Sequence, residues 1–186
     1  MTGQSGYSQQ TGAGLVEVAI AILVLSVGTL GLARLQISAK RLGFEAMQRT
    51  EAAAMAMDLF ERMRANPRAL ASYQTSGVGA ATGTRLPAPA SRCSQSSCTP
   101  GEISRWDLWQ WEQALNGASA AGSSGGLVEP TGCITVRERL VTVEIAWRGY
   151  LAMQAPGVAA SCGGAVYGPG ETGQQSLRML SWIGEG

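Results

Sequence analysis

The chain has no histidine among its 186 residues. Histidine is the commonest general base and the commonest metal ligand, so its absence removes the usual starting point for a catalytic or metal site. Charged residues make up only 15% of the chain and the formal net charge is +1. Such a balance predicts no bulk electrostatic attraction to nucleic acid. Nothing in the composition points to an enzyme, a cofactor or a bound metal.

A long apolar segment near the N-terminus is the strongest feature that is present. It runs from Leu15 to Ala33, and Glu17 is its only charged residue. As a helix it would be about 28 Å long, close to the hydrocarbon thickness of a bilayer. A carboxylate inside a membrane is costly and usually functional. Glu17 also lies near the predicted helix start, where unpaired N–H groups favour negative charge. We therefore predict a membrane-spanning helix in which Glu17 has a role.

A cut after Gly12 would give Glu17 a partner. The new amine of Ala13 would lie four residues earlier, on the same helix face. At about 4 Å and an effective dielectric of 20, the attraction is roughly 4 kcal/mol before desolvation is subtracted. The amine could equally pair with Glu17 of a neighbouring subunit. The alternative is a signal anchor that is never cleaved and has an acid at its edge.

The helical pattern continues beyond the apolar segment to Ala65. Apolar residues recur 7, 4, 7, 4 and 3 positions apart, which predicts one buried face made of Leu35, Leu42, Ala46, Ala53, Met57 and Phe60. Glu45–Arg49 and Asp58–Arg62 have the spacing of ion pairs along a helix. Pro67 should end the helix at Asn66. A helix from Leu15 to Ala65 would be about 77 Å long. Its first half needs lipid or a bundle of like helices, and its second half needs a globular head to pack on.

The remaining residues predict a small α+β head. Residues 68–98 have little periodicity and are predicted to be loop. Thr99 and Glu102 form a capping box with Pro100 between them, so a helix should begin there and end at Asn116-Gly117. Strands are predicted around residues 134–138, 141–147 and 177–183, the first two joined by a turn at Arg139-Leu140, and residues 117–126 are predicted to be a flexible connection. On the helix, Leu108, Trp111 and Leu115 form the apolar stripe, whereas Trp106 and Trp109 would cover loops or contact a partner.

All four cysteines follow the apolar segment, and their number is even. This usage suits disulfide bonds in an oxidising compartment, which in a Gram-negative cell is the periplasm. Four cysteines allow three pairings, and we prefer Cys93–Cys98 with Cys133–Cys162. A zinc site at Cys93 and Cys98 is the alternative, but it would need closer spacing and further ligands nearby.

Several of these stretches together resemble a known family. A polar leader ending in Gly12, followed by an apolar segment with Glu17 at its fifth position, is similar to class III prepilins of type IV pili and type II secretion systems. Residues 25–31, Leu35-Gln36 and the run Asp58-Leu59-Phe60-Glu61-Arg62-Met63-Arg64-Ala65-Asn66-Pro67 resemble the PilV type of minor pilin. Cys98, residues 107–111 (Asp-Leu-Trp-Gln-Trp) and residues 143–149 continue the resemblance more loosely.

The resemblance implies a type IV pilin-like fold, a long helix on a small antiparallel sheet. It implies a leader at residues 1–12, an assembly half of the helix at 13–33, an amphipathic half at 34–66 and a periplasmic head at 67–186. It further implies cleavage after Gly12 and methylation of Ala13 by prepilin peptidase. The partners would be the inner membrane, other minor pilins, the major pilin and, where one is present, a tip adhesin, in a complex that primes pilus assembly near the tip.

Three points stay open at this level. The leader has no Lys or Arg, and the basic residues after Ala33 would by the positive-inside rule place the head in the cytoplasm; the cysteines and the resemblance favour the periplasm. Gly28 and Gly31 would serve a close helix contact, local melting during packing, or neither. A type II secretion minor pseudopilin, or an uncleaved membrane-anchored periplasmic module, would share the apolar helix.

Overall fold

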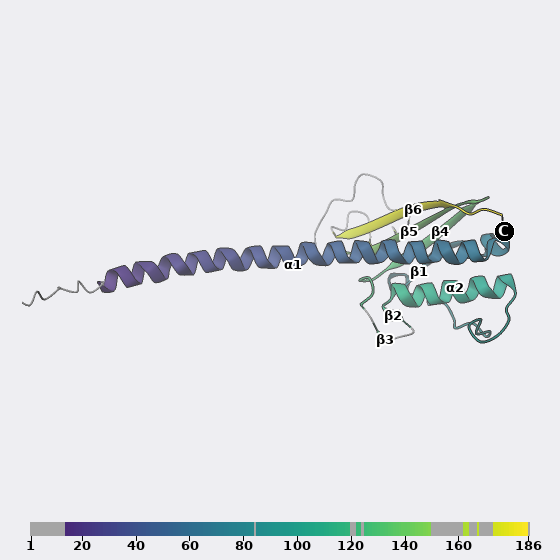
Figure 1. Cartoon of the computed structure of the whole chain (residues 1–186), viewed down its shortest axis with the longest axis horizontal. Helices are drawn as coiled ribbons and strands as arrows, with labels where there is room; N and C mark the ends of the chain where they lie inside the picture. The colour runs from purple at the N-terminus through teal and green to yellow at the C-terminus, as the bar shows by residue number, and fades with distance from the viewer. Residues whose placement is uncertain are drawn as a thin grey trace, which may run out of the picture. The chain divides into compact units, whose positions relative to one another are not determined.

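The structure is a computed structural model of the whole chain (Figure 1). It describes residues 14–83, 85–119, 122–123, 125–149, 162–163, 167 and 173–185. The chain divides into two compact units, residues 1–42 and 43–186, and each is described by itself. The leader residues and Ala13 lie outside the described residues.

One helix, α1, runs from Leu15 to Ala65, as predicted. It ends where expected, because Asn66 precedes Pro67. The predicted buried face is wrong, however. In the second unit the buried side chains are Glu45, Gln48, Ala52, Met55, Ala56, Leu59, Phe60 and Met63. At about 100° per residue, this face lies roughly a quarter turn from the predicted stripe. Leu42 and Met57 are exposed, and Phe60 is the only member of the predicted stripe that is fully buried.

A four-stranded antiparallel sheet forms the body of the second unit. Its order is β1-β4-β5-β6, with β1 at Thr75–Val78, β4 at Thr131–Arg137, β5 at Leu140–Arg148 and β6 at Gln174–Trp182. The hairpin prediction is confirmed for β4 and β5, which pair from Thr131↔Ala146 to Arg137↔Leu140. The turn lies one residue earlier than predicted, at Glu138-Arg139, and Glu138 adopts a left-handed φ of 55°. Beyond β5, β6 pairs along its whole length, from Leu140↔Trp182 to Arg148↔Gln174.

The segment predicted as loop contains further elements. Residues 67–73 form a 3-10 helix, η1 (Pro67–Tyr73), then β1 follows, and η2 (Ala80–Thr82) comes next. The prediction for residues 68–98 is therefore wrong in its first part. Strand β1 has no hydrophobic alternation that would reveal it, since its sequence is Thr-Ser-Gly-Val and only Val78 is buried. A two-stranded hairpin, β2 (Ala118–Ser119) with β3 (Gly122–Ser123), likewise replaces part of the predicted flexible connection.

The second half of α1 and helix α2 (Pro100–Leu115) pack on one face of the sheet (Figure 1). Alternate residues of β5, namely Val141, Val143, Ile145 and Trp147, face this core and are fully buried. Trp111 of α2 lies between the layers, and its indole N–H donates to the Met55 carbonyl of α1 at 3.2 Å. These layers confirm the α+β prediction: a long N-terminal helix packed on a small antiparallel sheet.

Candidate functional site

In the first unit, the described residues are Gly14 and α1 from Leu15 to Leu42. Every described side chain from Leu15 to Leu42 is exposed. Most of the large apolar residues there are more than half exposed, among them Leu23, Leu25, Leu30 and Leu35. By length and composition this helix could cross a membrane. An apolar surface of this extent is not stable in water, so the segment needs lipid or other helices around it.

Glu17 lies in the first turn of this helix with its side chain exposed. Its backbone N–H donates to the Gly14 carbonyl at 2.9 Å. The backbone N–H groups of the first helical turn have no partner within the helix, and their partial positive charge favours a carboxylate at this end. Gly12 and Ala13, the predicted cleavage and methylation sites, lie outside the described residues. The pairing of the Ala13 amine with the Glu17 carboxylate therefore stays a prediction.

Polar side chains further along the apolar half bond to their own helix. The Ser26 hydroxyl donates to the Ile22 carbonyl at 2.6 Å, and the Thr29 hydroxyl donates to the Ser26 carbonyl at 2.9 Å. Both donors are thereby satisfied inside the helix, as an apolar surrounding requires. A Cβ built on Gly28 or Gly31 would meet no atom within 4 Å. Neither glycine is needed for packing within the described chain.

The head contains two disulfide bonds. Cys93 pairs with Cys98, and Cys133 of β4 pairs with Cys162, which are the pairs preferred from the sequence. The first bond closes a short loop ahead of α2. The second ties the segment around Cys162 to the sheet, where the Cys162 N–H also donates to the buried Glu144 carboxylate. Within the described residues, no cluster of three or more His, Cys, Asp or Glu could hold a metal ion.

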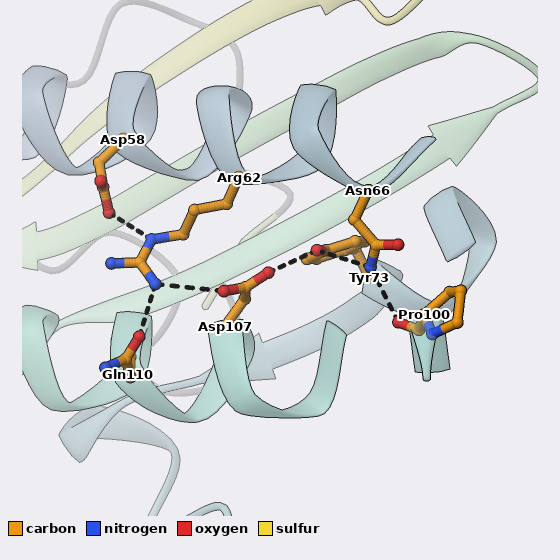
Figure 2. A network of polar contacts seen from close by, with 7 residues as sticks. All are labelled: Asp58, Arg62, Asn66, Tyr73, Pro100, Asp107 and Gln110. Atoms are coloured by element: carbon orange, nitrogen blue, oxygen red, sulfur yellow. Dashed lines mark hydrogen bonds and ion pairs between the residues drawn. The ribbon is translucent and has the colours of Figure 1, made fainter. Parts of the chain in front are cut away.

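Residues 58–67 and 107–111 meet at one polar junction, drawn in Figure 2. We define this junction by Asp58, Arg62, Asn66, Tyr73, Asp107 and Gln110. Arg62 of α1 is its centre: its Nε donates to Asp58 at 2.7 Å, and its Nη1 donates to Asp107 at 3.2 Å and to Gln110 at 2.6 Å. Burial opposes the charge of Arg62, but the carboxylates of Asp58 and Asp107 more than offset this and raise its pKa above the usual value.

The other oxygen of Asp107 continues the junction towards η1. The Tyr73 hydroxyl donates to it at 2.6 Å, and the pKa of Tyr73 is raised, first by burial and then by this bond. The Asn66 amide donates to the Tyr73 hydroxyl at 3.2 Å and to the Pro100 carbonyl at 2.8 Å. The end of α1, the turn after it and the start of α2 are thus held together through buried Asn66 and Asp107.

Only one pair of this junction could be predicted from the sequence. The Asp58–Arg62 ion pair was predicted from its spacing and is confirmed. Asp107 and Gln110, which lie 45 and 48 positions after Arg62, could be assigned only when the fold placed α2 beside α1. A network of this kind orients the two helices relative to each other.

The segment before α2 is fastened to that helix by carboxylates. The Leu86 N–H donates to Glu112 at 2.8 Å, and the Ser91 hydroxyl donates to Glu102 at 2.9 Å. The predicted capping box is present, because Thr99 accepts from the Glu102 N–H while Glu102 accepts from the Thr99 N–H. Bonds from Thr99 and Ser91 lower the pKa of Glu102 to about 2. Trp106 and Trp109 are half-buried and contact each other at a ring-centroid distance of 5.3 Å.

A long N-terminal helix packed on a four-stranded antiparallel sheet is the architecture of the type IV pilin-like fold. A family model described as "Tt1218-like: Type IV pilin Tt1218" matches residues 34–109. The matched region runs from α1 into α2 and includes every residue of the polar junction except Gln110. The match supports a type IV pilin. No curated protein and no solved structure matches the chain.

Proposed function

We propose that the protein is a PilV-type minor pilin of a type IV pilus. One observation carries the proposal: Glu17 lies in the first turn of a 51-residue helix and is the only charged residue from Leu15 to Ala33. The type IV pilin match over residues 34–109 supports the class. The PilV assignment rests on the resemblance of residues 58–67 and 107–111, which form the two halves of the polar junction.

The proposed maturation starts with insertion into the inner membrane. Prepilin peptidase removes residues 1–12 after Gly12 and methylates the amine of Ala13. Residues 13–33 then form the membrane-spanning and assembly half of the helix, residues 34–66 its amphipathic half, and residues 67–186 the periplasmic head. Two disulfide bonds in the head suit that oxidising compartment.

Glu17 acts in assembly by neutralising an Ala13 amine, its own or that of a neighbouring subunit. In either pairing the two opposite charges compensate each other, whereas an apolar bundle disfavours each of them alone. The protein then enters a complex with other minor pilins that primes pilus assembly, and it stays near the pilus tip beside the major pilin and, where one is present, a tip adhesin. Gly28 and Gly31 serve close packing or local melting of the helix in that bundle.

The test is mass spectrometry of the mature N-terminus. The protein is purified from its native membrane and from sheared pili, and the N-terminal peptide is identified. We expect N-methylalanine at position 13 and no peptide from residues 1–12. An intact Met1 on the membrane-bound protein would contradict the proposal and favour an uncleaved membrane anchor that carries a periplasmic binding module.

A minor pseudopilin of a type II secretion system is the second candidate, because it would share the helix and the processing. The resemblance of residues 58–67 to minor pilins favours the pilus. Deleting the protein separates the two: loss of surface pili with normal secretion supports a minor pilin, whereas loss of secretion with normal pili supports a pseudopilin.

A further inference from the structure

Strand β6 forms one edge of the sheet. Within the described residues it pairs with β5 and with no other strand. Two backbone bonds at the ends of this pair fix its pattern: the Gly149 N–H donates to Gly173, and the Ile183 N–H donates to Arg139. Bonded and non-bonded residues alternate in an antiparallel pair. The odd-numbered residues of β6 therefore bond β5, and the main-chain groups of Ser176, Arg178, Leu180 and Trp182 point to the open edge.

Among the residues that the structure describes, this edge lacks four common protections against another strand: short length, proline, lysine and a bulge. Natural edge strands are short, or they carry proline, lysine or a bulge. By contrast, β6 has nine residues, contains neither proline nor lysine, and pairs with β5 without a register shift. Its one charged residue, Arg178, is neutralised by Glu144 of β5, with Nη2 and Oε2 2.9 Å apart.

The C-terminal end of β6 carries an exposed apolar patch. Leu177 and Met179 pack towards the core, and Ser181 accepts a bond from Arg64 of α1, so the odd-numbered side chains lie on the α1 face. The even-numbered side chains lie on the opposite face. There Trp182 is 64% exposed and Leu180 60% exposed, and Leu140, opposite Trp182 on β5, is 39% exposed. We call Leu140, Leu180 and Trp182 the edge patch.

We infer that β6 accepts an extended strand from a different subunit of the pilus assembly, an inference that rests on the proposed function. Main-chain groups of Ser176, Leu180 and Trp182 bond the incoming strand, and the edge patch packs against its alternate apolar side chains. Because Arg178 already has its counter-charge, the fitting partner segment is uncharged.

The β6 strand of a second copy of this chain does not fit that role. Two copies joined through the same strand are related by a twofold axis. With antiparallel β6 strands, residues 43–65 of the two α1 helices run in opposite directions. With parallel β6 strands, those residues lie on opposite faces of the joined sheet. Neither arrangement lets both helices enter one bundle side by side, whereas a different subunit is free of this constraint.

The experiment is photo-crosslinking of the full chain in piliated cells. Benzoylphenylalanine replaces Trp182 at the edge patch or, as a control, Arg137, which is exposed on the same sheet face but lies on β4, two strands from this edge. We expect a crosslink from position 182 only, to an extended segment of another pilus subunit identified by mass spectrometry.

The backbone contribution is tested with Leu180→Pro and Leu180→Ala. Proline removes the N–H that points to the edge and leaves the bonds to β5, whereas alanine keeps that N–H. We expect Leu180→Pro to lower the crosslink yield about tenfold below that of Leu180→Ala, because a partner carbonyl loses its donor. Ser176→Pro, at another edge-facing position, replaces Leu180→Pro if that variant does not accumulate.

Other outcomes overturn the inference. These are equal crosslinks from positions 137 and 182, a crosslink to a second copy of this chain, no crosslink from position 182, or equal yields from the proline and alanine variants. The mature N-terminus is measured in the same cells. Methylated Ala13 without the crosslink would leave the proposed function standing and reject the role of β6.

Discussion

Gly132 shows how a single residue determines how closely α2 approaches the sheet of the head. A Cβ at this position in β4 would lie 2.3 Å from the Trp111 ring and 2.9 Å from Leu115. Both neighbours are fully buried, so neither side chain has space to move away. The close approach of α2 to the sheet therefore depends on a missing side chain, and the sequence around Gly132 reads as an ordinary strand.

We expect Gly132→Ala to destabilise the head by about 1–3 kcal/mol, the usual cost of overpacking a core. Tryptophan fluorescence during urea unfolding of the purified protein measures the change. Gly101→Ala is the matched control, since a Cβ there meets nothing within 4 Å. It should leave stability unchanged or slightly raised. Equal effects of the two substitutions would contradict the packing described for Trp111.

The lowered pKa of Glu102 predicts that the stability of the head depends on pH. Its pKa falls from 4.5 to about 2 on folding, because the folded state bonds the carboxylate to Thr99 and Ser91. A depressed pKa stabilises the fold above the unfolded value, and this stability is lost as the pH falls from about 4.5 towards 2. We expect the unfolding temperature of Glu102→Gln to fall less than that of the wild type between pH 5 and pH 2.5. Parallel decreases in a thermal scan would count against the capping role.

The polar junction acts at the scale of elements, because it fixes α2 beside α1. Arg62 is the only cation among the junction residues, and Asp107 is buried against it. Removing Arg62 leaves the buried carboxylate with Tyr73 alone as a side-chain donor among the bonds described. A buried charge that loses its partner costs more than an exposed pair is worth.

We expect Arg62→Met to destabilise the head by about 1–3 kcal/mol, a range reduced because Arg62 itself is partly exposed. Arg64→Met, two residues later, removes an exposed pair with Glu61 and an exposed bond to Ser181, and should cost no more than about 1 kcal/mol. Urea unfolding of both variants makes the comparison. If the two costs are equal, the junction does not hold the helices together.

At the scale of the whole molecule, α1 belongs to two environments. Its second half packs in the head through Ala52, Leu59 and Met63, which are fully buried. Its first half is exposed and apolar and is completed only by lipid or by other helices. In the second half, Met57 is an exposed apolar residue outside the buried face.

We expect Glu17→Ala to leave membrane insertion intact, since the substitution makes the segment more apolar, but to remove the protein from sheared pili. Immunoblots of membrane and pilus fractions measure both. Glu51→Ala, an exposed carboxylate of the same helix outside the apolar half, is the control and should be incorporated normally. Wild-type incorporation of the Glu17 variant would reject its role in assembly.

The sequence by itself determined the elements whose signals are local. The span of α1 follows from its composition and Pro67, the start of α2 from the Thr99–Glu102 capping box, and the β4–β5 hairpin from alternation of apolar residues. These signals depend on neighbours a few positions apart, so no tertiary structure is needed to recognise them.

Only the tertiary structure decided what depends on contacts between distant residues. The buried face of α1 differs from the predicted stripe because it includes the small Ala52 and Ala56, which allow close approach, and Gln48, which bonds the Gly126 carbonyl and the Val128 N–H. Strand β1 exists because β4 offers it an edge, although its own residues carry no strand pattern. The polar junction likewise needs contact between Arg62 and Asp107, which are 45 positions apart in the sequence. Only the packing of α2 against α1 brings them together.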